Sequence, residues 1–573
     1  MLTALATIAI AAACLAPIGA ATSVLTESWW RGRTYLGVAM AVLGIAAAGY
    51  LVFIATWIHP TVGVVLAYVI AGGALITVLI APARRKLLRA VPLVLVTAGI
   101  GFFYIAFLFL WSSQDGAFSL AQVRFLDWAL PIDNAIPYLF AERIAAGEST
   151  HLLVGDWNGS DRPPLQAGIV LIGRGLANPV LALSPSIAPG IGFGMSVVAQ
   201  LLWVPALFAA LRATGMRVNP SLVGVAMVAA TGTALVNTVY TWPKLLSAAL
   251  VLVALTFVID AYRTRLSLWP HVTSASLAMT LAALAHGAAV FAAPFVVMVA
   301  AWVLWRRSTT GWLRAVGLFL VTAALAYAPW MVYQRVTDPP GDRLLKWHLA
   351  GVIDPSDDRS FTTTLGAAYG NLTMSTWWEG RLANIAAIAG PEPFSSIRIA
   401  LLGGIAQRNT HEFFATTAAL SLSLFTLCAV LIVVGFRRVR GHALRDADRV
   451  VLCVLLASAV AIAAWALVMF LPGSTVVHQG SHVWIALLIA APAAWIASHR
   501  LAWGWGVVAV QAAFTAWLYG PGRPGEQVEP IAIGLALGGA SLVLWGAVCL
   551  HRTTSRRVTT ASRSVTDPLQ RHP

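Results

Sequence analysis

The chain has 573 residues, of which 59% are hydrophobic and only 10% are charged, and its mean hydropathy is +0.80. Soluble globular domains carry about 25% charged residues, so this composition argues against a row of soluble domains and predicts one membrane-embedded bundle. The formal net charge of +15 does not indicate nucleic-acid binding, because the arginine clusters stand between apolar stretches, as cytoplasmic anchors do. The four cysteines lie in apolar stretches without CxxC spacing and are interpreted as small core residues.

Apolar stretches follow one another along almost the whole chain. A helix that crosses a membrane needs roughly 20 apolar residues, and about fifteen stretches approach that criterion. The sequence therefore predicts an all-α, polytopic membrane protein. The expected spans lie at residues 2–26, 35–58, 61–82, 90–111, 189–211, 221–238, 245–259, 272–285, 288–305, 315–333, 412–436, 450–471, 482–498, 503–519 and 531–551.

Basic clusters between the spans predict the orientation, since lysine and arginine are enriched on the cytoplasmic side. One alternation of the spans places every strong cluster on that side. It puts the N-terminus outside, the C-terminus in the cytoplasm and the protein in the plasma (inner) membrane. The clusters are Arg31 and Arg33, residues 83–89, Arg212 and Arg217, Arg263 and Arg265, Arg306, Arg307 and Arg314, residues 437–449, and Arg500.

The same alternation leaves two long extracytoplasmic segments, 112–188 and 334–411, which are rich in tryptophan, tyrosine and leucine. Segments of this length are usually functional or disordered, and their composition favours ordered helices on the membrane surface. They separate N-terminal spans at 1–111, central spans at 189–333 and C-terminal spans at 412–551. The Ser-, Thr- and Arg-rich tail at 552–573 is expected to be disordered.

The most informative stretch runs from Leu130 to Leu165. Pro131 can start a helix, and Asp133 then lies in its first turn. Apolar residues between positions 136 and 144 recur at helical spacing, so we expect an amphipathic helix at 133–147 that lies along the membrane surface. The Arg162-Pro-Pro-Leu165 sequence cannot continue a helix and predicts a rigid, extended corner.

This stretch resembles the catalytic motif of the GT-C superfamily of membrane glycosyltransferases, in the branch of protein O-mannosyltransferases and lipid-A aminoarabinose transferases. The similarity lies in Asp133-Asn134, Tyr138, Gly147 and the Asp161-Arg-Pro-Pro-Leu165 element. The remaining spans are similar only in hydropathy. The resemblance implies a GT-C-like fold, a polyprenyl-phosphate sugar as donor, and Asp133 as the general base.

Two positions depart from the family pattern. Where the family often has an acid at the start of a later span, this chain has Tyr240-Thr-Trp-Pro-Lys244. Where the family often has a lysine, this chain has His286 followed by Gly287. A second catalytic carboxylate is therefore not implied by the resemblance, and a non-catalytic relative of these enzymes remains an alternative.

Candidate site residues follow from this interpretation. Asp133 and Asp161 are the catalytic candidates; their alternatives are a helix-end charge for Asp133 and a turn contact or ion pair with Arg162 for Asp161. Cations near span ends suit a lipid phosphate, although a lysine can also extend to the interface. The substrate-binding candidates are Tyr138, Arg162, Lys244, His286, Arg343, Lys346 and His348.

The sequence has no convincing metal or nucleotide motif. Asp354, Asp357 and Asp358 resemble a solvated loop more than a cation site. His478 and His482 are four residues apart, but Gly480 argues against the continuous helix that a metal pair would need. The sequence has no Walker A motif, no GxGxxG in front of an expected strand and no GxSxG elbow, so we expect no cofactor, with a divalent metal left open.

The sequence thus favours an inverting glycosyltransferase that moves a sugar from a polyprenyl-phosphate donor to a glycan, lipid or protein acceptor of the cell envelope. Its expected partners are membrane lipids, the donor and the acceptor, and not nucleic acid. The alternative from another class is a transporter or flippase for a lipid-linked glycan. The acidic motif discriminates between them, because a flippase needs no base there.

Overall fold

The computed structural model describes residues 2–30, 33–80, 90–113, 115–126, 128–264, 268–307, 311–390, 394–402, 412–413, 416–470, 482–522 and 525–565. The basic run at 83–89, His478 and residues 566–573 lie outside these ranges. Within them the chain is helical, with two isolated β-bridges and no strand. Twelve helices are long and apolar enough to cross a membrane, or up to thirteen if one bent pair counts as a single span. The all-α polytopic class is thereby confirmed, while the expected number of about fifteen spans is not.

Among the N-terminal helices, α3 packs against both α1 and α4. The turn between α3 and α4 is set by His59, which is extended, and by Pro60, which opens α4 and whose fixed φ suits a first helical position. The elements are α1 (Leu2–Leu25), α2 (Glu27–Trp30), α3 (Thr34–Ile58), α4 (Pro60–Leu79) and α6 (Val91–Leu108).

The first expected external segment consists of short helices and turns. Its amphipathic helix, α8, begins at Ile136 and not at Asp133, which lies in a separate 3-10 turn. Pro137 accounts for this irregular start, because proline is tolerated only in the first turn of a helix. The elements are α7 (Ala117–Val123), η1 (Ile132–Asn134), α8 (Ile136–Ala145), η2 (Gly159–Asp161), α9 (Leu165–Leu176), α10 (Asn178–Leu183) and η3 (Pro185–Ile187).

The central helices pack around α15, which is almost entirely buried. Near its end, the fully buried Asp260 accepts hydrogen bonds from Arg33 at 2.6 Å and pairs with His271 at 2.9 Å, which ties α15 to α3 and α16. The elements are α11 (Ala188–Leu201), α12 (Trp203–Ala213), α13 (Val218–Ala229), α14 (Gly232–Val239), α15 (Lys244–Arg263), α16 (Leu268–Ala285), η4 (Gly287–Ala292), α17 (Ala293–Arg307) and α18 (Trp312–Val332).

The last part of the chain holds the second expected external segment and the C-terminal helices. The helix α27 extends to Val565, so the backbone is helical over part of the tail for which composition predicts disorder. The elements are η5 (Tyr333–Thr337), α19 (Arg343–Ala350), α20 (Phe361–Gly370), α21 (Met374–Ala389), α22 (Ser395–Leu402), η7 (Thr417–Leu420), α23 (Ser423–Val439), α24 (Asp446–Val468), α25 (His482–His499), α26 (Leu501–Tyr519) and α27 (Pro530–Val565).

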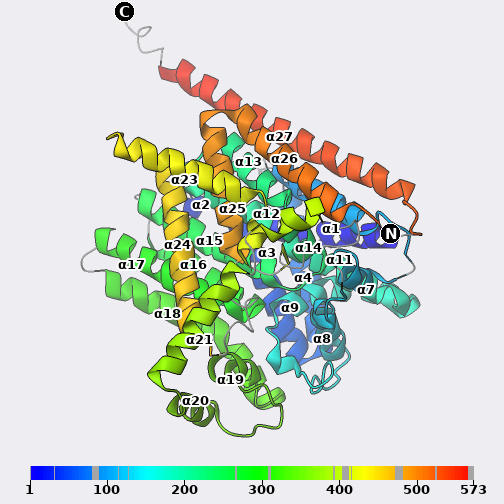
Figure 1. Cartoon of the computed structure of the whole chain (residues 1–573). Helices are drawn as coiled ribbons and strands as arrows, with labels where there is room; N and C mark the ends of the chain where they lie inside the picture. Colours follow the sequence, from blue (N-terminus) through cyan, green and yellow to red (C-terminus); the bar gives the residue numbers. More distant parts are fainter. Residues whose placement is uncertain are drawn as a thin grey trace, which may run out of the picture.

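Glycines allow α27 to lie directly against α6. A Cβ added at Gly99 would stand 2.6 Å from the carbonyl oxygen of Gly539, and one at Gly546 would stand 2.6 Å from that of Pro92. Small residues permit this close approach of two helix backbones, the contact that associates apolar helices in membranes. The last helix is thereby held against the N-terminal part of the bundle (Figure 1).

The two expected external segments lie at one end of the molecule, where α8 and α9 are near α19 (Figure 1). The buried Asp338 links them, because it accepts hydrogen bonds from the Ser160 backbone N–H at 2.8 Å and from the Thr150 hydroxyl at 3.4 Å. The Gln334 side chain adds a bond to the Ser160 carbonyl oxygen at 2.9 Å. The two segments therefore form one folded unit.

The orientation expected from the arginine clusters can be tested by labelling. Glu148, in the first external segment, and Ala443, in the 437–449 loop, are both exposed. In a variant without the four native cysteines, a cysteine at position 148 should react with a membrane-impermeant maleimide in intact cells, and one at position 443 only after lysis. Labelling of position 443 but not 148 in intact cells would contradict the orientation.

Candidate functional site

The site is built around a break in the main chain between α14 and α15. The span that precedes it is already broken, since α13 and α14 are bent by 69° relative to each other. After α14, Thr241 has a φ of 55°, a left-handed conformation that is strained for a β-branched residue. Pro243 cannot join a preceding helix, so α15 begins afresh at Lys244.

Hydrogen bonds attach this break to the segment that carries Asp133. The Tyr240 hydroxyl donates to the Pro131 carbonyl oxygen at 2.7 Å, and the Thr241 hydroxyl donates to that of Asn134 at 3.0 Å. Both donors are buried. These bonds bring the start of α15 next to the 3-10 turn of Asp133, although more than a hundred residues separate them in the sequence.

Asp133 forms an ion pair with Arg162, with 3.0 Å between Oδ1 and Nη2. The side chains are 18% and 17% exposed, so the pair can be reached from solvent. Burial lowers the pKa of Arg162, while the charges of Asp133 and Asp161 raise it. The guanidinium group of Arg162 thus holds the carboxylate in a fixed position.

A second arginine joins the group through a tryptophan. The guanidinium carbons of Arg162 and Arg343 lie 4.5 Å and 4.0 Å from the ring centroid of Trp157, at cation–π distance. Arg343 also donates to the Asp156 side chain at 2.6 Å, and hydrogen bonding to Arg343 lowers the pKa of Asp156. Arg343 therefore joins the segments 112–188 and 334–411 beside the Asp133 pair.

Lys244, the first residue of α15, is only 3% exposed. Its ammonium group has no hydrogen-bond partner among the described residues. It lies 3.6 Å from the ring centroid of Trp242 and 5.2 Å from that of Phe413, and it is close enough to Asp133 for electrostatic attraction. A buried cation held by aromatic rings in this way can offer its N–H groups to an anion.

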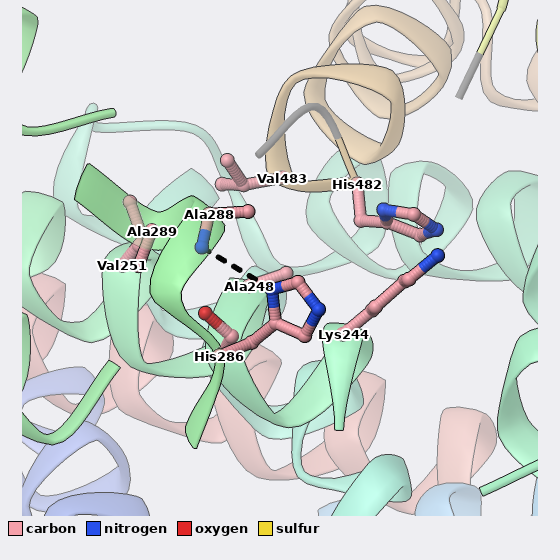
Figure 2. Close-up of a pocket in the computed structure, with 9 residues that line it drawn as sticks. Lys244, Ala248, Val251, His286, Ala288, Ala289, His482 and Val483 are labelled. Atoms are coloured by element: carbon pink, nitrogen blue, oxygen red, sulfur yellow. Dashed lines mark hydrogen bonds between the residues drawn. The ribbon is translucent and has the colours of Figure 1, made fainter. Parts of the chain in front are cut away.

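Two histidines complete the surroundings of Lys244. Lys244, His286 and His482 come from three different elements, and their side chains point toward the same small space (Figure 2). The pocket has a volume of about 10 Å³, room for about one water molecule. Asp133 does not line it, so the acid and the basic pocket are neighbours rather than one cavity.

An apolar cavity of about 260 Å³ adjoins this pocket, since Ala289 lines both. It lies between α16, η4, α17 and α18. Its walls contain methyl, aromatic and thioether groups and carry few polar atoms, as hydrocarbon sites do. The other residues that line it are Met279, Thr280, Ala283, Val290, Ala293, Val296, Val297, Phe319, Ala323 and Tyr327.

Asp161, the second catalytic candidate, lies in a turn. It is 4% exposed, and its carboxylate accepts a hydrogen bond from the Asn158 backbone N–H at 3.0 Å in a capping box. Burial raises its pKa, and the arginines Arg162 and Arg343 lower it. These contacts match the turn alternative considered for Asp161.

Two of the binding candidates lie in packing contacts. Tyr138 is stacked on Phe118, with 5.6 Å between ring centroids. The Lys346 ammonium group is buried, donates to the Asp357 carbonyl oxygen at 2.9 Å and pairs with Asp342 at 3.4 Å. These contacts engage both side chains within the fold.

His348 stacks on Trp347, with ring centroids 4.9 Å apart. Burial and the positive charge of Arg162 lower its pKa to about 4. Its ring is therefore neutral at physiological pH. The candidates that the structure brings together are thus Asp133, Arg162, Lys244, His286, Arg343 and His348.

Sequence reasoning considered His482 only as half of a metal pair with His478. The missed signal is the position of His482 at the start of an apolar helix. When that helix packs in the bundle, the side chain of its first residue can point into the interior. Among the described residues, no group of three or more histidines, cysteines, aspartates or glutamates is placed to hold a metal ion.

Comparisons of the chain with protein-family models, with curated proteins and with solved structures found no match. The resemblance to GT-C enzymes therefore stays a prediction.

The lowered pKa of His348 gives a pH-dependent stability. Its folded pKa of about 4 lies below the ordinary value of 6.5, so the unfolded chain binds more protons between these pH values and folding weakens as the pH falls through that window. We expect His348→Gln to lower the melting temperature at pH 7 by about 2–4 °C, and this difference to shrink at pH 4.5. A difference that is constant with pH would contradict the assignment.

Proposed function

We propose that the protein is a glycosyltransferase that transfers a sugar from a lipid phosphate carrier to an extracytoplasmic hydroxyl acceptor. The observation that supports it best is that the carboxylate of Asp133 has as its neighbour the buried ammonium group of Lys244, which has no hydrogen-bond partner among the described residues. Such a transfer needs a base at the attacking oxygen and positive charge at the leaving phosphate.

In the proposed reaction, the acceptor hydroxyl attacks the anomeric carbon of the donor and Asp133 takes the hydroxyl proton. The new bond joins the acceptor oxygen to this carbon, while the bond from the carbon to the phosphate oxygen breaks. The phosphate leaves as a monoester of the lipid. Its charge rises from one to two negative charges, and Lys244, with His286 beside it, is suited to stabilise that increase.

Arg162 is proposed to orient Asp133, because the ion pair fixes one carboxylate oxygen and leaves the side chain 18% exposed. Arg343 and Trp157 extend this basic and aromatic surface toward the second external segment. Proton transfer requires a base in a defined position. Arg162 and the 3-10 turn η1 would hold Asp133 in such a position.

The apolar cavity supports a lipid-linked donor over a water-soluble one. A hydrocarbon chain gains roughly 0.8 kcal/mol for each buried CH₂ group, and the cavity of about 260 Å³ shares the lining residue Ala289 with the basic pocket. A nucleotide sugar has no apolar part for that space. A flippase for a lipid-linked glycan would share these lipid contacts, but it has no need of Asp133 as a base.

The Asp133→Asn variant tests the enzyme against these alternatives. The change keeps shape and volume but removes the base, and general-base catalysis contributes about 10²–10⁴-fold, so sugar transfer from a polyprenyl-phosphate sugar should fall by two or more orders of magnitude. Donor binding should be retained, because the phosphate is proposed to lie at Lys244. Transfer is measured with purified protein and a radiolabelled sugar.

Asp358→Asn is the matched control, since Asp358 is an exposed acid of the second external segment. It should leave turnover unchanged. Equal transfer by wild type and Asp133→Asn would overturn the role of Asp133, and the lack of transfer by the wild-type protein would favour the flippase or a non-catalytic relative.

The apolar cavity is tested by filling it. Ala323→Phe places a ring in the cavity, whereas Ala324→Phe, its neighbour, is exposed and lines no part of it. Exclusion of about two methylene groups should weaken the binding of farnesyl phosphate about tenfold in the first variant and not in the second, with affinity measured by calorimetry. Equal affinities for both variants would place the hydrocarbon chain elsewhere.

A further inference from the structure

His482 stands out among the residues of the basic pocket. It is 5% exposed, and its Nε2 atom has no hydrogen-bond partner among the described residues. Figure 2 shows its ring beside the Lys244 ammonium group. The Lys244 ammonium group and the His482 ring thus face the same pocket, which no described side chain fills. Each of them has a polar atom without a hydrogen-bond partner among the described residues. Such groups are costly unless a bound partner satisfies them.

The hydrogen bonds of His286 assign its proton. The Ala288 backbone N–H donates to His286 Nδ1 at 3.2 Å, which caps the 3-10 turn η4. Because Nδ1 accepts a hydrogen bond, the proton of the neutral ring is on Nε2. A second proton on Nδ1 would break the cap, so His286 is poorly placed to gain charge. His482 carries no such bond among the described residues.

Among the described residues, the charged or titratable side chains that line the pocket with His482 are those of Lys244 and His286. Both are positive or potentially positive, so they oppose a charge on His482 while the pocket is empty. An anion reverses this balance, since opposite charge nearby favours the charged form of a histidine.

We propose that His482 is a binding residue for the phosphate group and takes up a proton from solvent when a phosphate monoester dianion places one of its oxygens in the pocket beside Lys244. The chemical class of the ligand is a phosphate monoester, whether the headgroup of a lipid or a free phosphate. The adjoining apolar cavity favours the lipid. That choice of ligand rests on the proposed function, because the monoester is the leaving group of the transfer.

Proton uptake has a consequence for the reaction. The donor is a phosphate diester with one negative charge, and the product is a dianion. A site that gains a proton as the second charge develops stabilises the product side of the reaction and the transition state that precedes it. The product would then bind more tightly than the donor, and its release would become easier as the pH rises.

The experiment uses calorimetry on the full chain in nanodiscs, with farnesyl phosphate as the probe, at pH 8, where this ligand is already a dianion. Titrations in two buffers with different ionisation enthalpies give the number of protons exchanged. Wild type should take up on the order of 0.5–1 proton for each bound molecule. His482→Gln should abolish the uptake and weaken binding about tenfold, while His442→Gln, in the exposed 437–449 loop, should change neither.

Lys244→Met identifies the group that is protonated. This variant should bind farnesyl phosphate more weakly but still take up a proton. The proposal would be overturned if Lys244→Met lost the proton uptake while His482→Gln retained it. It would also be overturned if the wild-type protein took up no proton, and this result does not depend on the folding of any variant. Inorganic phosphate should bind at least tenfold more weakly than farnesyl phosphate, and equal affinities would overturn the assignment to a lipid headgroup.

The outcome separates this proposal from the proposed function. Proton uptake without sugar transfer would support the phosphate site but contradict the proposed glycosyltransferase activity. A lipid-phosphate transporter can use the same anion site. Sugar transfer without proton uptake would keep the enzyme and reject the role of His482.

Discussion

The two hydrogen bonds from Tyr240 and Thr241 to the carbonyl oxygens of Pro131 and Asn134 are the contacts on which the site depends. A break between two apolar helices leaves backbone groups without helical partners, and these groups must be satisfied within the protein. Gln166 meets this need at the break, because its side chain donates to the Thr241 carbonyl oxygen at 2.7 Å, whereas the Tyr240 and Thr241 hydroxyls bond to carbonyl oxygens of the segment that carries Asp133. The hydrogen bonds made at this helix break thus bring Lys244 close to Asp133.

A second constraint arises where the segments 112–188 and 334–411 meet. Asp338 is 1% exposed and receives its hydrogen bonds from the turn that precedes Arg162, while Arg343 reaches back to Asp156. Removing a partner from such buried, charge-assisted bonds is more costly than removing an exposed ion pair. The segment that carries Arg162 is therefore held from both sides, which gives the Asp133 carboxylate its fixed position.

The sequence predicted those parts of the site that local chemistry defines. The Asp-Asn and Arg-Pro-Pro elements drew attention to Asp133 and Arg162, and a cation at the start of an apolar stretch drew attention to Lys244. The helical class followed from hydropathy, although several apolar stretches form helices too short to be counted as spans. Residues whose role depends on distant neighbours could not be assigned: Lys346 pairs within its own segment, and His482 gains its place only when α25 packs beside α15.

The charges of the site also indicate which kind of ligand it can bind. Asp133 has a cation of its own in Arg162, so Lys244 is not needed to balance it. Lys244 instead lies buried against aromatic rings, which offset only part of the cost of removing an ammonium group from water. Burial at that cost, next to a histidine with an unused nitrogen, is expected where an anion regularly completes the pocket. In the proposed transfer, the paired carboxylate of Asp133 would serve proton removal, and Lys244, whose ammonium group has no hydrogen-bond partner among the described residues, would serve the departure of the phosphate.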